Sequence, residues 1–199
     1  MIPAKALIIL AVSYSAAAAA LDKRAHVVSC ADPTNNELIT QEFGNAMNMA
    51  SIASQYIAQN GADPLFVSYF MTNDPVAVKT KYDQIVSDVG PADIYCQPFP
   101  AGRNVNCSGL NALTRTPSGN IYLCPSWYNL ADQSALCTQS GLASTRSGTI
   151  VHEMSHAEAG THDHNGSCSG SKTLSPADAL ENATTYSCFA REVYKKTQC

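Results

Sequence analysis

Apolar residues recur at helical spacing through the first third of the chain. Between residues 32 and 61 they form one stripe at intervals of three or four positions, made up of Ile39, Phe43, Ala46, Ala50, Ala53 and Ile57. Asp32 or Thr34 can cap the start of this helix, and Gly61 ends it. A second helix is predicted for residues 75–89, where a proline opens the apolar pattern. The N-terminal part of the domain is therefore expected to be helical.

The middle of the chain has the turn residues and the short apolar runs that are typical of strands. Residues 93–99 predict one strand, and residues 110–125 predict two strands joined by a turn at 117–120. Helical spacing returns at residues 147–160 and again from Ser175 to near the C-terminus. Because there is no internal repeat and no linker, this order predicts an α+β fold, a helix-rich single domain with a small antiparallel sheet.

The first 24 residues have the composition of a segment that is removed. Residues 1–20 combine an early lysine, a short apolar run and small residues, which is the layout of a secretory signal peptide. Residues 21–24 end in the dibasic pair Lys23-Arg24, so the mature domain is expected to span residues 25–199. The apolar run is too short for a membrane helix, which needs ~20 residues. We therefore expect a secreted, extracellular protein with no membrane contact after processing.

The cysteines and the sequons support secretion. All eight cysteines follow residue 24, and an even number in a secreted chain predicts a disulfide framework. Sequons at Asn106, Asn165 and Asn182 predict a glycoprotein. The formal net charge is −4 with no cluster of lysine or arginine, which argues against a nucleic-acid partner. We expect a monomer.

Four of the five histidines lie between residues 149 and 167, and two of them belong to the segment HEMSH. His152 and His156 stand four residues apart, so on a helix both imidazoles project from one face. Two neutral histidine nitrogens, one further ligand and an open position for water are what a catalytic Zn²⁺ requires. Glu153 lies between them and can take a proton from that water as a general base. The motif predicts a zinc site for peptide hydrolysis.

Three residues compete for the place of the third zinc ligand. His162 lies where the pattern HExxHxxGxxH would have its third histidine, but Ala159 replaces the glycine and no methionine follows Met154. Glu181, on the last predicted helix, would complete the site as in thermolysin-like schemes. Asp163 belongs to the segment GTHD, directly after the HEMSH helix. Spacing alone leaves the choice open.

GTHD resembles the GTxD element that follows HExxH in the deuterolysin, or aspzincin, family of secreted fungal zinc endopeptidases. NIYLCPSWY and ENATTYSCFA are similar to the family's strand ahead of the active-site helix and to its final helix, so the resemblance covers roughly residues 90 to 199. It implies a zincin-like fold in which His152, His156 and Asp163 bind zinc. It also implies that Glu153 is the general base.

The same resemblance implies the disulfide framework. The family pattern accounts for three bonds, Cys30–Cys96, Cys107–Cys124 and Cys137–Cys199. Cys168–Cys188 would be an additional bond that ties the loop behind the site to the last helix.

One position departs from the family in a way that bears on catalysis. The family has a tyrosine after GTxD whose hydroxyl helps to stabilise the tetrahedral oxyanion, and Gly166 stands at that position here. The loss of one oxyanion donor can cost ~10²–10³ in rate. His164, one residue after Asp163, is predicted to supply the missing donor as a catalytic residue.

We therefore expect a divergent, secreted zinc endopeptidase that hydrolyses peptide bonds with a zinc-activated water and a glutamate general base. Its protein or peptide substrate is expected to lie antiparallel to an edge strand near Asn120–Cys124. The alternative is a secreted zinc-binding or host-interacting protein on the same scaffold, with weak activity or none. The missing tyrosine favours this alternative, whereas the retained Glu153 favours the enzyme.

Overall fold

The computed structural model describes residue 30 and residues 32–87, 93–99 and 101–199. The predicted signal peptide, the processing site and the predicted end of the second helix lie outside these residues. Within them, no helix is both long enough and apolar enough to cross a membrane.

Helices dominate the described part of the chain, as predicted. In chain order the elements are α1 Pro33–Asn60, α2 Pro64–Phe70, α3 Pro75–Ser87, β1 Ile94–Tyr95, β2 Ala112–Arg115, β3 Asn120–Leu123, the 3-10 helix η2 Pro125–Asn129, α4 Ala135–Thr138, α5 Arg146–Ala159, α6 Cys168–Ser171, α7 Pro176–Glu181 and α8 Ala183–Gln198. The pattern did not predict α2, because seven mostly apolar residues are too few to show a helical period. The signal for this helix was its cap, since Asp63 accepts a hydrogen bond from the amide of Phe66 and Pro64 fills the first position.

The sheet is mixed rather than purely antiparallel. Its strand order is β1-β3-β2, in which β2 pairs antiparallel with β3 as a hairpin and β1 pairs parallel with β3. The long connection between β1 and β2 lets the chain reach the opposite edge of β3. Because β3 is hydrogen-bonded on both sides, the expectation of a substrate strand beside Asn120–Cys124 is wrong. The edge strand that faces the helices is β2.

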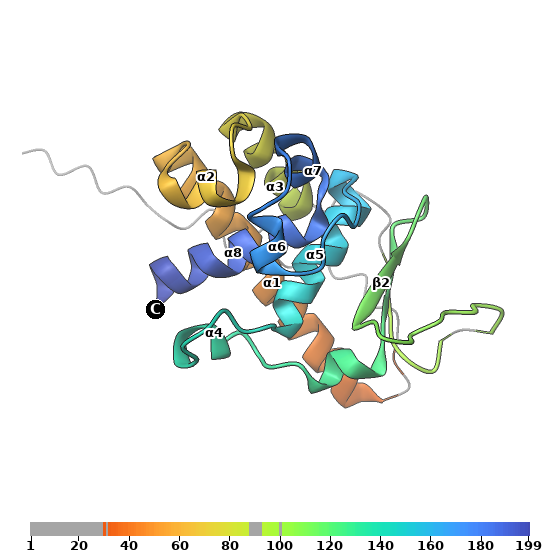
Figure 1. The fold of residues 1–199 in the computed structure, drawn as a ribbon. Helices are drawn as coiled ribbons and strands as arrows, with labels where there is room; N and C mark the ends of the chain where they lie inside the picture. Colours follow the sequence, from red (N-terminus) through yellow and green to blue (C-terminus); the bar gives the residue numbers. More distant parts are fainter. Residues whose placement is uncertain (1–29, 31, 88–92, 100) are drawn as a thin grey trace, which may run out of the picture.

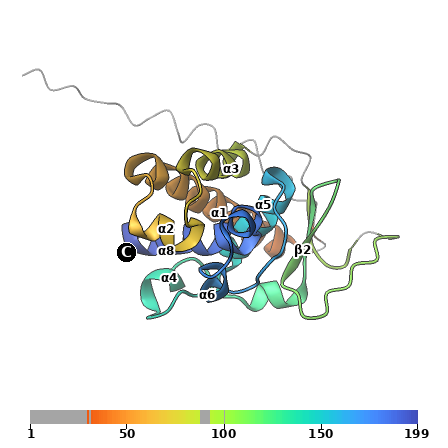
Figure 2. The same cartoon turned by 45° about the horizontal axis from the view of Figure 1, so that its top comes forward.

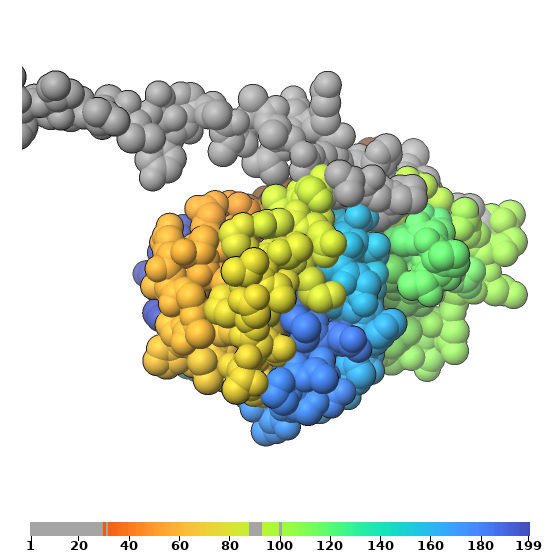
Figure 3. Space-filling view, turned by 90° about the horizontal axis from the view of Figure 1, so that it is seen from above, coloured from red at the N-terminus to blue at the C-terminus, as the bar shows by residue number. Residues whose placement is uncertain are grey.

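The helices form one body and the sheet covers one side of it (Figure 1). α5 packs against α8, α1 and α3, and its other side packs against β2. The turned view in Figure 2 also places α5 between the other helices and the sheet. In the space-filling view of Figure 3, C-terminal segments in blue separate the yellow residues of α2 and α3 from the green residues of the sheet. The predicted HEMSH helix is therefore held from both sides.

Aromatic rings fix α8 against the N-terminal helices. The ring of Phe189 lies 5.3 Å from that of Phe70, and the rings of Tyr82 and Tyr186 are also 5.3 Å apart. The hydroxyl of Tyr82 donates to the carbonyl of Tyr186 at 2.7 Å, which satisfies a polar group that is fully buried. Such rings bury large apolar areas in defined geometry, so α8 has one orientation.

The four implied disulfide bonds are confirmed. They join Cys30 to Cys96, Cys107 to Cys124, Cys137 to Cys199, and Cys168 to Cys188. The first and third close loops with sequence separations of 66 and 62 residues. Each stabilises the fold by about 4 kcal/mol through the entropy of the unfolded chain.

The single C-terminal helix that was predicted from Ser175 is broken at Asn182. The cap at Ser175 is present, but Asn182 adopts an extended backbone conformation and separates α7 from α8. Its side chain is fully buried. Its Oδ1 accepts from the amides of His164 and Asn165, and its Nδ2 donates to the hydroxyls of Ser171 and Thr185. The sequon at Asn182 therefore cannot carry a glycan in the folded protein, which corrects the prediction for that site.

We predict that Asn182→Ala destabilises the protein by about 2–6 kcal/mol, because the partly buried amides of His164 and Asn165 lose their acceptor at ~1–3 kcal/mol each. Denaturant unfolding monitored by circular dichroism measures this change. The matched control is Asn48→Ala, an exposed position in α1, where the change should stay within about 0.5 kcal/mol. If Asn182→Ala lowers the free energy of unfolding by less than about 1 kcal/mol, the hydrogen bonds of the Asn182 side chain do not stabilise the fold as we infer.

Candidate metal centre

α5 carries the two histidines and has well-defined ends. Thr145 caps its start, since its hydroxyl accepts from the amide of Gly148, and Gly160 ends it in the left-handed conformation with φ of 62°. This end agrees with the predicted role of Gly160. The imidazoles of His152 and His156 lie one turn apart with their ring centroids separated by 4.8 Å. Both rings therefore face one side of the helix, toward β2 and the chain that follows Gly160.

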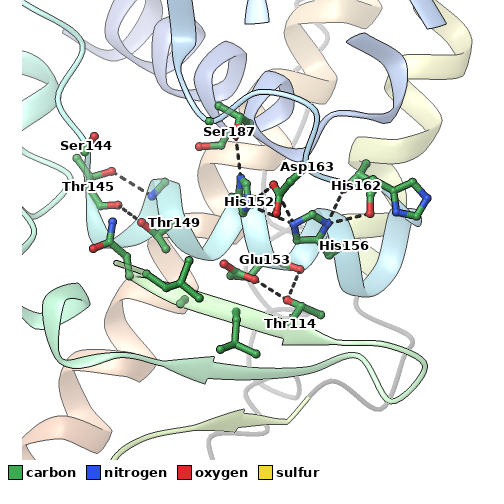
Figure 4. A pocket seen from close by; sticks show the side chains of 18 of the residues that line it. Thr114, Ser144, Thr145, Thr149, His152, Glu153, His156, His162, Asp163 and Ser187 are labelled. Carbon is green, nitrogen blue, oxygen red and sulfur yellow. Dashed lines mark hydrogen bonds and ion pairs between the residues drawn. The ribbon is translucent and has the colours of Figure 1, made fainter. Parts of the chain in front are cut away.

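The chain after Gly160 is tied to the break in the C-terminal helix. The amide of His162 donates to the carbonyl of Glu181 at 2.7 Å, and the amide of Ala183 donates to the carbonyl of His162 at 2.9 Å. Asn182 accepts from the next amides, as described above. Asp163 lies between these fixed points, so its carboxylate is directed back to α5 (Figure 4).

The structure brings His152, His156 and Asp163 together. Their donor atoms form a small triangle, with 3.2 Å between the two Nε2 atoms and 3.2 and 3.5 Å from these atoms to Asp163 Oδ1. A tetrahedral zinc ion with ligand bonds of ~2.0–2.2 Å separates its ligands by about 3.3–3.6 Å. Two imidazoles and one carboxylate at these separations fit Zn²⁺ with one position left for water.

Further hydrogen bonds orient the two imidazoles. His156 Nδ1 donates to the carbonyl of Thr161 at 2.8 Å, which leaves Nε2 as the free lone pair. His152 Nδ1 lies 3.4 Å from the hydroxyl of Thr184. Without a metal, protonated imidazoles of His152 and His156 would hydrogen-bond to Asp163 and hold the pKa of its carboxyl well below the ordinary value. Asp163 is therefore anionic, as a metal-binding carboxylate must be.

Glu153 is buried beside the triangle, and its carboxylate is hydrogen-bonded to Thr114. Its Oε2 accepts from the hydroxyl of Thr114 at 2.7 Å, and the same hydroxyl lies 3.1 Å from its backbone carbonyl. Burial raises the pKa of Glu153 above its ordinary value, although His152 and the bond from Thr114 act in the opposite direction. A carboxylate whose pKa is raised in this way is suited to accept and return a proton.

The other predicted residues lie elsewhere. His162 is exposed at the edge of the cavity, and Figure 4 shows its ring turned away from the triangle. His164 lies beside α7, with Nδ1 3.7 Å from Asp178 and Nε2 4.0 Å from Glu181. Neither His164 nor Glu181 lines the cavity: Glu181 is the last residue of α7, and the His164 ring lies beside that helix. The geometry gives no support to the predicted role of His164 as an oxyanion donor.

The triangle opens into a cavity of about 580 Å³ between α5, β2 and α8. Three functional candidates in and around it were missed by the sequence interpretation, namely Thr114, Asn182 and Arg191. Thr114 lies in a predicted strand and Arg191 in a predicted helix. The periodicity of these segments indicated secondary structure but no functional role for either residue. Asn182 carried a signal, since it lies in the segment that is similar to the family's final helix.

Comparisons with known proteins identify the family of the chain. Residues 55–191 match the aspzincin family, described as lysine-specific metallo-endopeptidases. A neutral protease 2 homologue of Aspergillus fumigatus is 29% identical over 201 residues, which cover 94% of this chain and 43% of the relative. One of Sclerotinia sclerotiorum is 29% identical over 192 residues, which cover 88% of this chain and 50% of the relative. The chain thus spans about half the length of the curated relatives it matches.

The fold is also similar to a solved structure. A zinc peptidase from Grifola frondosa superposes with a TM-score of 0.65 and 19% sequence identity, over 81% of this chain and 96% of that one. At this identity the likeness concerns the fold alone. Together with the match over residues 55–191, these findings show that the chain is a divergent member of the aspzincin, or deuterolysin-type, family of metallo-endopeptidases.

Proposed function

We propose that this protein is a secreted zinc endopeptidase in which His152, His156 and Asp163 hold the ion. The observation that carries the proposal is the triangle of donor atoms with sides of 3.2–3.5 Å beside the buried Glu153. A protein that only bound zinc would have no use for a buried carboxylate next to the ligands. Family membership supports the same reaction.

The residues of the chain divide the work between them. When bound, zinc would lower the pKa of a water to about 7 and polarise the peptide carbonyl. Glu153 takes a proton and returns it to the leaving amine, while Thr114 keeps the carboxylate in position. The free edge of β2 offers its backbone groups to an extended peptide, which pairs antiparallel to it. The reacting bond then lies between Thr114 and the triangle.

Neither Gly166 nor His164 replaces the family tyrosine. Gly166 lines the cavity at that position and offers no side chain, and His164 faces α7. We therefore expect a slow enzyme, with turnover below that of relatives that have the hydroxyl. If the missing hydroxyl abolished turnover completely, the protein would bind zinc without cleaving peptides, which is the alternative function.

We predict that Glu153→Gln retains zinc and lowers kcat by roughly 10²–10⁴-fold, because the proton acceptor is removed while the ligands stay in place. Zinc content by mass spectrometry and cleavage of a denatured protein measure the two effects. Glu37→Gln, the same change at an exposed position in α1, is the control and should behave as wild type. If wild type binds zinc but cleaves nothing more than Glu153→Gln does, the protein is a zinc binder and not an enzyme.

A second prediction concerns Thr114 as a positioning residue. Thr114→Val keeps the shape but loses the hydroxyl that holds Glu153, a bond to a charged group worth ~1.5–3 kcal/mol. We expect kcat to fall roughly 10- to 100-fold with KM and zinc content little changed. Thr114→Ser retains the hydroxyl and should recover most of the rate. Equal rates for the valine and serine variants would contradict the role.

A further inference from the structure

The cavity extends from the metal centre along the first half of α5, and this extension has an unusual lining. We call it the side pocket and define it by Ser144, Thr145, Gly148, Thr149, Ser187 and Arg191. Figure 4 shows Ser144, Thr145 and Thr149 on the side of His152 away from Asp163. The side pocket is rich in hydroxyl groups and holds one charged residue, Arg191.

Arg191 is buried and lacks an acidic partner. It is 7% exposed, and no carboxylate of the described residues forms an ion pair with it. Its Nε donates to the carbonyl of Ser187 at 3.3 Å and its Nη1 to that of Ala143 at 2.7 Å. Its Nη2 contacts the sulfurs of Cys168 and Cys188 at 3.0 and 3.1 Å. These neutral acceptors hold the guanidinium in place but leave its charge uncompensated, which is costly in a buried site.

A glycine makes room for this arginine. A Cβ on Gly148 would lie 2.6 Å from Arg191 Cδ and 3.2 Å from its Nε, so a larger residue would push the side chain out of its place. Burial lowers the pKa of Arg191, yet a guanidinium with an ordinary pKa above 12 stays charged at neutral pH. The side pocket is therefore permanently positive. Of the described residues that line the whole cavity, the acidic ones are Glu153 and Asp163, and both belong to the metal centre.

The position of the side pocket relative to β2 indicates which substrate residue enters it. The hairpin turn that ends β2 lies on one side of Thr114, and Thr145 and Thr149 lie on the other (Figure 4). A peptide that runs antiparallel to β2 therefore carries the residue after the cleaved bond toward Thr149.

We propose that the side pocket binds the side chain of the substrate residue directly after the cleaved bond and selects an acidic residue, aspartate or glutamate, over lysine. An incoming carboxylate supplies the counter-charge that Arg191 lacks, and the hydroxyl of Ser187 can donate to it. A lysine ammonium would meet a like charge and no carboxylate there. The inference rests on the proposed endopeptidase function and gives this chain a preference opposite to the one in the description of its family.

The test uses peptides that are identical except for glutamate, glutamine or lysine after the cleaved bond. We expect zinc-loaded wild type to cleave the glutamate peptide with a kcat/KM at least tenfold above that of the lysine peptide. Glu153→Gln should bind the peptides without cleaving them. Calorimetry on this variant should show tighter binding, that is a lower Kd, for the glutamate peptide than for the lysine peptide. Equal values, or a preference for lysine, would overturn the inference.

Variants of the side pocket assign the preference to its charge. Arg191→Gln should remove the advantage of glutamate, and Thr149→Asp, at a partly exposed position in the first turn of α5, should reverse it in favour of lysine. If Arg191→Gln does not fold, Thr149→Asp alone tests whether the charge of the side pocket sets the preference. Lys196→Gln removes an exposed charge from the same helix, where Lys196 contacts Tyr56, and should leave the preference unchanged. An unchanged preference in Thr149→Asp would contradict the inference.

The two readouts keep the inference separate from the proposed function. If wild type cleaves no peptide but Glu153→Gln still binds the glutamate peptide at least tenfold more tightly, the proposed function fails and the side pocket stands. If wild type cleaves the peptides without regard to this residue, the proposed function stands and the side pocket inference fails.

Discussion

The metal centre depends on the hydrogen bonds between the broken C-terminal helix and the chain after α5. α5 presents two of the proposed ligands by its periodicity alone, but the third proposed ligand, Asp163, lies on an exposed turn with no regular structure of its own. The turn is fixed because His162 pairs with the backbone on both sides of Asn182, and because the Asn182 side chain accepts from the two amides after Asp163. The position of Asp163 therefore depends on the break in the helix at Asn182. A continuous helix from Ser175 onward would leave these amides without partners.

The local parts of this arrangement were accessible from the sequence. The HEMSH helix, its glycine end and the cap of α1 follow from spacing and capping residues. The resemblance to a family supplied the disulfide pairs and brought His152, His156 and Asp163 forward as the proposed ligands. The remainder depends on contacts between distant segments. Nothing near Thr114 in the sequence indicates that its hydroxyl meets Glu153, which is 39 residues away. The parallel pairing of β1, the position of β2 at the edge and the neutral surroundings of Arg191 depend on tertiary structure in the same way.

Negative and positive charges occupy different parts of the cavity, the metal centre and the side pocket. Negative charge is concentrated at Glu153 and Asp163, where the proposed zinc ion and the proposed proton transfer would need it. Positive charge lies at Arg191 on α8, held by carbonyls and a disulfide that is anchored in the same helix. The Cys168–Cys188 bond, which the resemblance gave as additional to the family framework, therefore contacts the arginine as well as the loop behind the site. A change in the final helix can then alter the substrate preference without disturbing the ligands.

The central claim is that Asp163 is the third zinc ligand. Its most direct test is the zinc content, after dialysis against a weak chelator, of Asp163→Ala beside His162→Ala and Glu181→Ala. Even the loss of an outer-shell partner costs roughly 10–100-fold in metal affinity, so the loss of a ligand should cost at least about 100-fold. We expect that only Asp163→Ala loses its zinc and that the other two variants retain as much as wild type. Retention of zinc by Asp163→Ala, together with its loss from either of the others, would contradict the account.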